Sequence, residues 1–162
     1  MIYILLGIIS IPVLVFLAAQ DIKERMIYSF PVLILSACWA VYSAYLYRNN
    51  PAFIMAAWLI TAALYIAYRV FSVWGDGDSD MFLLFTGIIL CSFEINNVLQ
   101  FMFILSVSLV FSQLLALLGG IMEAKLKKMK LTRHSGIAVV PGFSVILMIA
   151  IVFGILRKAG IV

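Results

Sequence analysis

The sequence predicts an all-α, polytopic membrane protein with about six transmembrane helices, built as a single domain over residues 1–162. Composition indicates a membrane protein, because 66% of the residues are hydrophobic and only 11% are charged, too few to cover a soluble domain of this size. Long apolar runs recur along the whole chain and are continuous rather than alternating. Continuous runs favour helices over barrel strands, since a helix pairs its own backbone groups within lipid.

Six apolar segments are candidates for these helices, since about 20 apolar residues cross the hydrocarbon core of a bilayer. In chain order they cover roughly 2–19, 29–47, 51–73, 81–93, 98–119 and 136–156. The first has neither upstream charge nor a small-residue cleavage site, which favours a retained helix over a removed signal peptide. Pro31 and Pro51 stand in the first turns of the second and third segments, where a missing backbone N–H is harmless.

Polar and glycine residues set the boundaries of the last three segments. The fourth segment is the shortest and ends at Glu94-Ile95-Asn96-Asn97, which is too polar for lipid and predicts a turn. The fifth ends at Gly119-Gly120, and the sixth carries Val140-Pro141-Gly142-Phe143 near its start. Six crossings place both chain termini on the same side of the membrane.

The distribution of basic residues predicts the orientation of these helices. The net charge of +4 is confined to short connections, which indicates membrane topology rather than a nucleic-acid partner. Connections 20–28 and 121–135 hold most of the lysine and arginine, whereas 48–50 and 94–97 contribute a single arginine. The positive-inside rule therefore places 20–28, 74–80 and 121–135 in the cytoplasm of a multi-pass cell-membrane protein, with both termini outside.

One of these cytoplasmic connections is strongly acidic. The stretch WGDGDSDMF at 74–82 places Asp76, Asp78 and Asp80 within five positions. Two predicted helices separate Asp21 from this stretch, and an even number of crossings returns the chain to the same face. We therefore expect Asp21 and the acidic segment to lie at the same membrane depth.

The residues alone leave several interpretations of the acidic segment open. A calcium loop is disfavoured, because Met81 and Gly87 occupy the positions at which such a loop needs Gly and Glu. A solvated turn with helix-capping aspartates, an ion or proton path, and a pair of carboxylates that share a proton all remain.

No metal site or cofactor is expected from the remaining residues. Cys38 and Cys91 lie in apolar runs without paired-ligand spacing, which predicts small buried residues rather than a disulfide or a zinc site. His134 is the only histidine and lies in a basic connection, so a two-histidine zinc protease motif is excluded.

Three short motifs then combine into a resemblance. Gly75-Asp76-Gly77-Asp78 stands at the start of a predicted helix, and Asp21-Ile22-Lys23-Glu24-Arg25-Met26-Ile27 follows the first predicted helix. These stretches resemble the G-x-G-D and D-x-[KR]-x-R-x-I motifs of membrane aspartyl proteases of the type IV prepilin peptidase and archaeal preflagellin peptidase family. Val140-Pro141-Gly142-Phe143 is loosely similar to that family's Ile-Pro-Phe element. The resemblance covers nearly the whole chain.

The resemblance implies an aspartic-type endopeptidase with Asp21 and Asp78 as the catalytic pair. Its substrates would be prepilin-like or preflagellin-like precursors, in which a short basic leader precedes a hydrophobic helix and is removed at the cytoplasmic membrane face. We further expect a group of neighbouring residues to shape the site or bind the leader. These residues are Gly75, Asp76, Gly77, Asp80, Glu24 and Trp74.

The chain also departs from the family pattern. Tyr28-Ser29 stands where many bacterial members have Pro-Asn, and Asp80 stands where they usually have Lys. The chain lacks the cysteine-bearing insert of the large bacterial enzymes, so N-methyltransferase activity is not expected. An alternative function is a small ion-coupled transporter, or a noncatalytic membrane subunit, that uses the acidic cluster to bind cations.

Overall fold

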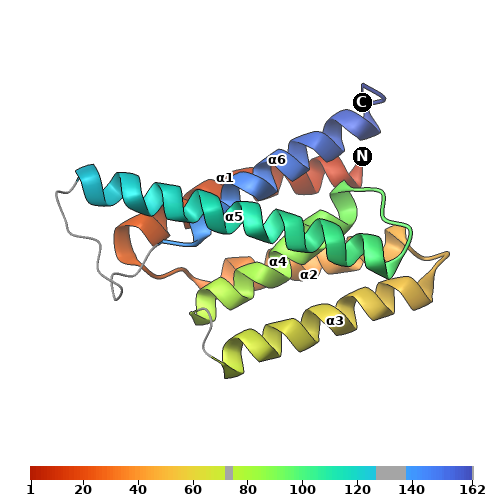
Figure 1. Ribbon diagram of the computed structural model, residues 1–162. Helices are drawn as coiled ribbons and strands as arrows, with labels where there is room; N and C mark the ends of the chain where they lie inside the picture. Colours follow the sequence, from red (N-terminus) through yellow and green to blue (C-terminus); the bar gives the residue numbers. More distant parts are fainter. Residues whose placement is uncertain (72–74, 127–137, 162) are drawn as a thin grey trace.

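The computed structural model describes residues 1–71, 75–126 and 138–161, and over these residues the chain is helical and contains no strand (Figure 1). The helices are α1 (Ile2–Glu24), α2 (Ser29–Leu46), α3 (Pro51–Val70), α4 (Asp76–Ser92), α5 (Val98–Leu126) and α6 (Val140–Lys158). In the described part of the chain, five helices, all but α4, are long and apolar enough to cross a membrane. The predicted all-α polytopic membrane fold is confirmed.

Two helix boundaries differ from the sequence prediction in a way that matters for the acidic residues. Helix α1 continues past the predicted end at residue 19 to Glu24, so Asp21 lies in its last turns. Helix α4 begins at Asp76 rather than at residue 81, so the acidic segment forms its first turns. Carboxylates are stable at the start of α4, because unpaired N–H groups and the positive end of the helix dipole lie at a helix N-terminus.

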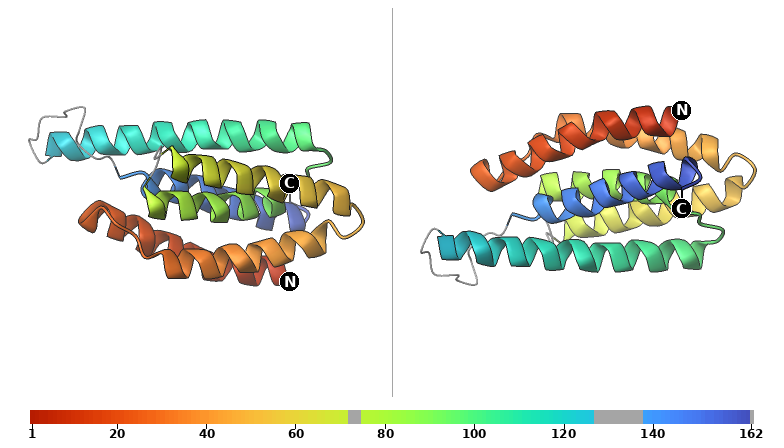
Figure 2. Two further views of the ribbon diagram at one scale, coloured as in Figure 1. Left: turned by 90° about the horizontal axis from the view of Figure 1, so that it is seen from below. Right: turned by 90° about the horizontal axis from the view of Figure 1, so that it is seen from above.

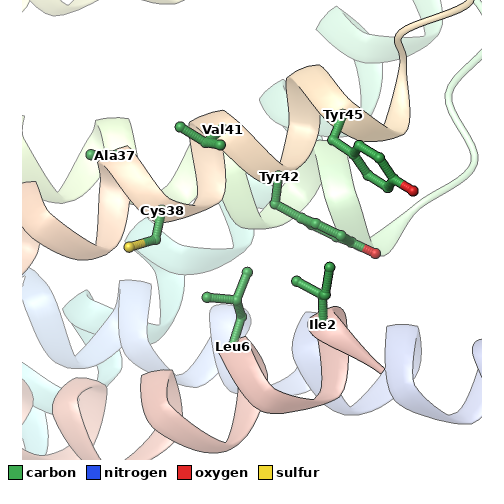
Figure 3. A pocket seen from close by; sticks show the side chains of 7 residues that line it. All are labelled: Ile2, Leu6, Ala37, Cys38, Val41, Tyr42 and Tyr45. Atoms are coloured by element: carbon green, nitrogen blue, oxygen red, sulfur yellow. The ribbon is translucent and has the colours of Figure 1, made fainter.

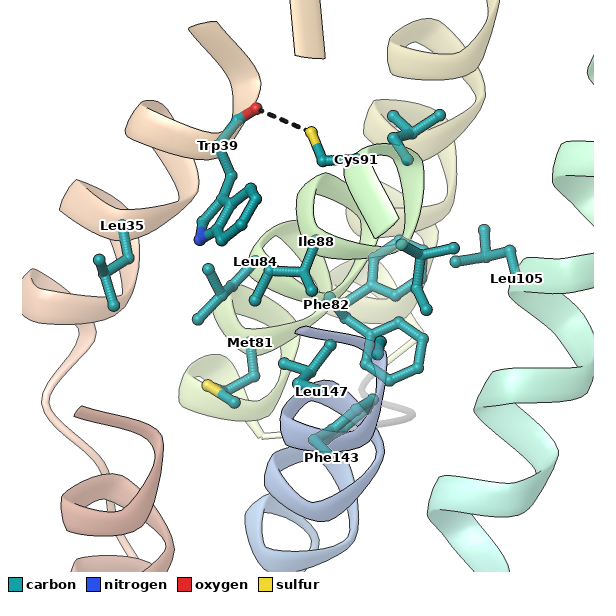
Figure 4. Packing of buried hydrophobic residues seen from close by; sticks show 14 of the residues in the cluster. Leu35, Trp39, Met81, Phe82, Leu84, Ile88, Cys91, Leu105, Phe143 and Leu147 are labelled. Carbon is teal, nitrogen blue, oxygen red and sulfur yellow. Dashed lines mark hydrogen bonds between the residues drawn. The ribbon is translucent and has the colours of Figure 1, made fainter. Parts of the chain in front are cut away.

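Helix α4 forms the centre of the bundle. Its side chains from Ser79 to Ser92 are buried with the exception of Leu83. Figure 2 shows α1 and α2 on one side of the molecule, α5 on the other, and α3, α4 and α6 between them. The side chains around α4 come from α2 (Leu35, Trp39), α5 (Leu105) and α6 (Phe143, Leu147), as Figure 4 shows. Enclosure by neighbouring helices explains why α4, the shortest of the described helices, is the least exposed of them.

The bundle has two ends with different side chains. At one end, which we call the carboxylate end, α1 and α5 finish and α4 begins. Ion pairs join Arg25 to Glu123 at 2.7 Å and Arg69 to Asp76 at 3.2 Å there. The opposite end carries both chain termini (Figure 1) and is called the termini end. The even number of helices predicted this common location of the termini.

An apolar groove lies near the termini end, between α1 and α2 (Figure 3). It has a volume of about 540 Å³ and is lined by Ile2, Leu6, Ala37, Cys38, Val41, Tyr42 and Tyr45. Cys38 is exposed along this groove, contrary to the expectation that both cysteines are buried, because an apolar side chain is stable against lipid as well as in a core. Cys91 is buried in α4.

Candidate active site

A cavity of about 340 Å³ opens at the carboxylate end of the bundle. Two parts of the chain that are distant in sequence form its walls: the end of α1 with the connection to α2, and the start of α4. Its lining residues are Asp21, Arg25, Met26, Ile27, Ser29, Gly75, Asp76, Gly77 and Asp78. The structure thus brings Asp21 together with the start of α4, as the even number of intervening helices predicts.

Asp21 is held on the inner wall of this cavity. Its side chain is only 6% exposed, and the backbone N–H of Val140 donates a hydrogen bond to Asp21 Oδ2 at 3.0 Å. The backbone carbonyl of Asp21 accepts the N–H of Arg25 at 3.0 Å, which closes the end of α1. Arg25 adopts a left-handed conformation with φ 56°, the conformation that turns the chain away from a helix end and into the cavity wall.

Asp78 lies in the first turn of α4, ahead of the apolar part of that helix, which begins at Met81. Burial of the Asp78 carboxyl, reinforced by the negative charge of Asp21, raises the pKa of Asp78 to about 6, while a backbone hydrogen bond from Gly75 opposes this shift. Two carboxyl groups that line one cavity and repel each other's ionisation are suited to sharing a proton.

The glycines of the G-x-G-D segment keep the cavity walls close. A Cβ atom at Gly77 would lie 2.5 Å from Cγ1 of Ile27, so a larger residue there would displace the Ile27 side chain. A Cβ atom at Gly75 would make an ordinary contact of 3.5 Å with Asp78 Oδ2. Gly77 therefore permits the close approach of Ile27 to the start of α4.

The other two aspartates of the segment belong to a network with α3. Asp80 is buried and accepts a hydrogen bond from the Tyr65 hydroxyl at 3.0 Å. Arg69 donates to the same hydroxyl at 2.6 Å and to Asp76 Oδ1 at 3.2 Å. Asp76 also lines the cavity, whereas Asp80 does not. The network fixes the first turns of α4 against α3 and leaves Asp78 facing the cavity.

Glu24, the remaining predicted site residue that the structure describes, does not line the cavity. Glu24 is exposed at the end of α1, and its carboxylate accepts a hydrogen bond from Gln20 Nε2 at 3.4 Å. Trp74 lies outside the described residues, as does His134. Within the described residues no group of three His, Cys, Asp or Glu side chains is arranged to hold a metal ion.

Several cavity residues were not singled out from the sequence as site residues. Arg25, Met26 and Ile27 belong to the stretch that carries the family resemblance, so their position in the motif was an available signal. The hydrogen bond from Val140 has a weaker signal in the sequence, since Val140 belongs only to the element that is loosely similar to Ile-Pro-Phe. Nothing in the spacing of Tyr65 and Arg69 on α3 pointed to Asp80 and Asp76.

Comparison of the chain with protein-family models, with curated proteins and with solved structures gave no match. The chemistry of this site is therefore inferred from its own residues and their arrangement.

Proposed function

We propose that this protein is a membrane aspartyl endopeptidase that removes a short basic leader from prepilin-like or preflagellin-like precursors at the cytoplasmic membrane face. One observation supports this function above all others. Asp21 and Asp78 line the same cavity, and the charge of Asp21 contributes to the raised pKa of Asp78. A pair of carboxylates that holds a single proton is the machinery with which aspartic proteases activate water.

The reaction needs one ionised and one protonated carboxyl at the same time. The ionised carboxylate takes a proton from water while the water oxygen bonds to the scissile carbonyl carbon, and the protonated carboxyl gives its proton to the carbonyl oxygen. Collapse of the tetrahedral intermediate breaks the C–N bond. One carboxyl gives its proton to the departing amine nitrogen, and the other carboxylate takes a proton from a hydroxyl of the intermediate as the new carboxyl group forms. The dyad ends with one proton again, so the cycle needs no cofactor.

The position of the cavity fits the proposed substrate class. It lies at the end of a bundle of apolar helices, where a substrate helix in the membrane would emerge into water. Cleavage there separates a polar leader from the apolar helix that follows it. Asp76 and Glu24 are exposed near this point and offer negative charge to a basic leader.

The distribution of acidic groups disfavours the alternative of an ion-coupled transporter. A relay across the membrane needs polar groups along the path. Among the described residues, Asp21, Glu24, Asp76, Asp78, Asp80 and Glu123 lie at the carboxylate end, and Glu94 lies at the other end of α4. No described carboxylate lies midway between them.

Incubation of the purified protein with leader-bearing precursors tests the proposal directly. We expect a shortened product whose new N-terminus, determined by mass spectrometry, lies at the junction between the basic leader and the apolar helix. Precursors in which the leader is intact but the apolar helix is replaced by a soluble sequence serve as the control and should stay uncut. Ion flux into proteoliposomes without any cleavage would support the transporter instead.

A further inference from the structure

The carboxylate of Asp21 is held by the first backbone groups of a helix that is distant in sequence. Val140 donates its N–H to Asp21 Oδ2 at 3.0 Å, and the N–H of Val139 hydrogen-bonds the same carboxylate. Val139, at the N-cap of α6, provides no side-chain cap for its own helix. Asp21 therefore serves as the cap, in the way that an N-terminal Asp satisfies unpaired N–H groups at the start of its own helix.

The start of α6 is fixed in place by its neighbours. Ser144 donates a buried hydrogen bond to the carbonyl of Leu14 in α1 at 3.1 Å. Gly142 lies directly against the backbone of α5 at Ser112 and Ala116, where a Cβ atom would clash. The N–H groups of Val139 and Val140 consequently keep their direction towards Asp21.

Charged side chains of both signs lie near Asp21. Arg25 at the end of α1 and Glu123 on α5 both act on the Asp21 carboxylate, but they pair with each other at 2.7 Å. The start of α6 adds backbone N–H groups and the positive end of its dipole, and both favour an ionised Asp21.

The surroundings of Asp78 are different. Its carboxyl accepts one backbone N–H, that of Gly75, and the positive end of α4 also favours its ionised form. The nearby cation Arg69 pairs with Asp76. Charge-assisted hydrogen bonds are about twice as strong as neutral ones, so the carboxyl with more donors is the better anion.

Burial acts against the hydrogen bonds from α6. Asp21 is 6% exposed, so desolvation disfavours its ionised form. The hydrogen bonds from Val140 and Val139 favour that ionised form. The two effects thus make competing predictions that an experiment can separate.

We propose that the start of α6 determines which aspartate of the dyad is ionised. Asp21 is the ionised base that takes the proton from water, and Asp78 is the protonated acid that polarises the carbonyl. This division of roles rests on the proposed peptidase function. The location of the proton, however, is a property of the resting protein and is measurable without any substrate.

Infrared difference spectroscopy shows which of the two carboxyl groups, that of Asp21 or that of Asp78, carries the shared proton. Spectra of the purified protein are compared between about pH 5 and about pH 7, a range that brackets the pKa of Asp78 of about 6. We expect a protonated-carboxyl band that is lost in Asp78→Asn and retained in Asp21→Asn. A band that is lost in Asp21→Asn and retained in Asp78→Asn would overturn the proposal.

Removal of a single N–H group tests the role of α6. Replacing Val140 by the α-hydroxy acid with the same side chain turns its amide into an ester and deletes the donor to Asp21. We expect the acidic limb of the pH profile of kcat/KM to move up by about one pH unit, because Asp21 then takes up a proton more readily. The same replacement at Ile155, at the other end of α6, deletes an N–H far from the dyad and should leave the limb in place.

The outcomes separate this proposal from the proposed function. An unchanged acidic limb after the Val140 replacement, or an equal shift after the Ile155 replacement, would overturn the role of α6 even if precursors are cut. If no precursor is cut but the infrared band follows Asp78, the peptidase function fails while the proton location stands.

Discussion

The two ends of the bundle use polar side chains in opposite ways. At the termini end, buried or partly buried hydroxyl groups pair with other protein groups: Tyr3 with Ser92 at 2.8 Å and Tyr47 with the carbonyl of Leu90 at 3.1 Å. At the carboxylate end, two carboxyl groups that repel each other are kept together on the wall of a cavity. Paired polar groups are typical of structural contacts, whereas like charges held together are typical of sites that do chemistry.

Neutral substitution of the dyad is the strongest test of this contrast. Asp21→Asn and Asp78→Asn should each lower the cleavage rate by at least about a thousandfold, because either change removes a proton-transfer group from a pair that acts as a unit. Initial rates on a precursor peptide measure the loss. The matched control is Glu94→Gln at the termini end, whose carboxylate is exposed and 3.8 Å from Arg157. A similar loss of cleavage in Glu94→Gln would show that the requirement for a carboxylate is not specific to the carboxylate end.

Substitution of Gly77 tests whether its close contact with Ile27 positions the dyad. Gly77→Ala should lower kcat by about a hundredfold, since a displacement of about 1 Å between catalytic groups has effects of that size. Gly119→Ala is the matched control, because a Cβ atom there meets nothing within 4 Å. Comparison of the two variants by kcat and by thermal unfolding in detergent separates misplacement from unfolding. Equal kcat values would show that the Gly77 contact with Ile27 does not position the dyad.

The pH dependence of cleavage reports the proton of the dyad. Burial and the charge of Asp21 raise the pKa of Asp78 to about 6, so Asp78 is protonated below that pH and ionised above it. If the protonated form is the active one, kcat/KM falls about tenfold per pH unit as the pH rises above about 6. A profile that stays flat from about pH 5 to about pH 8 would contradict the requirement for this proton.

A hydroxyl deletion tests whether the buried Asp80 is structural. Tyr65→Phe removes the donor to Asp80 and should lower the free energy of unfolding by about 1–3 kcal/mol, the range for a buried polar group left unpaired. Tyr42→Phe at the termini end removes an exposed acceptor of Lys158 and should change that free energy by less than about 0.5 kcal/mol. Thermal unfolding of both variants in detergent checks the difference. If Tyr65→Phe is as stable as Tyr42→Phe, the contact with α3 does not hold the start of α4.

The sequence predicted the helices and the common end of the two aspartates because both depend on local hydropathy and on counting crossings. Asp21 and Asp78 were found through their motifs, and parity placed them together. Asp76 is exposed and lines the cavity, whereas Asp80 is buried. The sequence could not predict this difference, since it depends on which side of α4 meets α3. The cap that Asp21 provides for the start of α6 depends on how α6 approaches α1, and no spacing within one segment records that approach.

The smallest expected effect concerns the exposed acidic groups. Because Asp80 is buried, the charge available to a basic leader comes from Asp76 and Glu24, and Asp76 already pairs with Arg69. Asp76→Asn combined with Glu24→Gln should raise KM about two- to threefold for lysine-rich leaders, since exposed charge pairs contribute little. The increase should disappear at about 1 M salt, where the Debye length falls to about 3 Å. An equal increase for neutral leaders would show that these carboxylates shape the cavity rather than attract the leader.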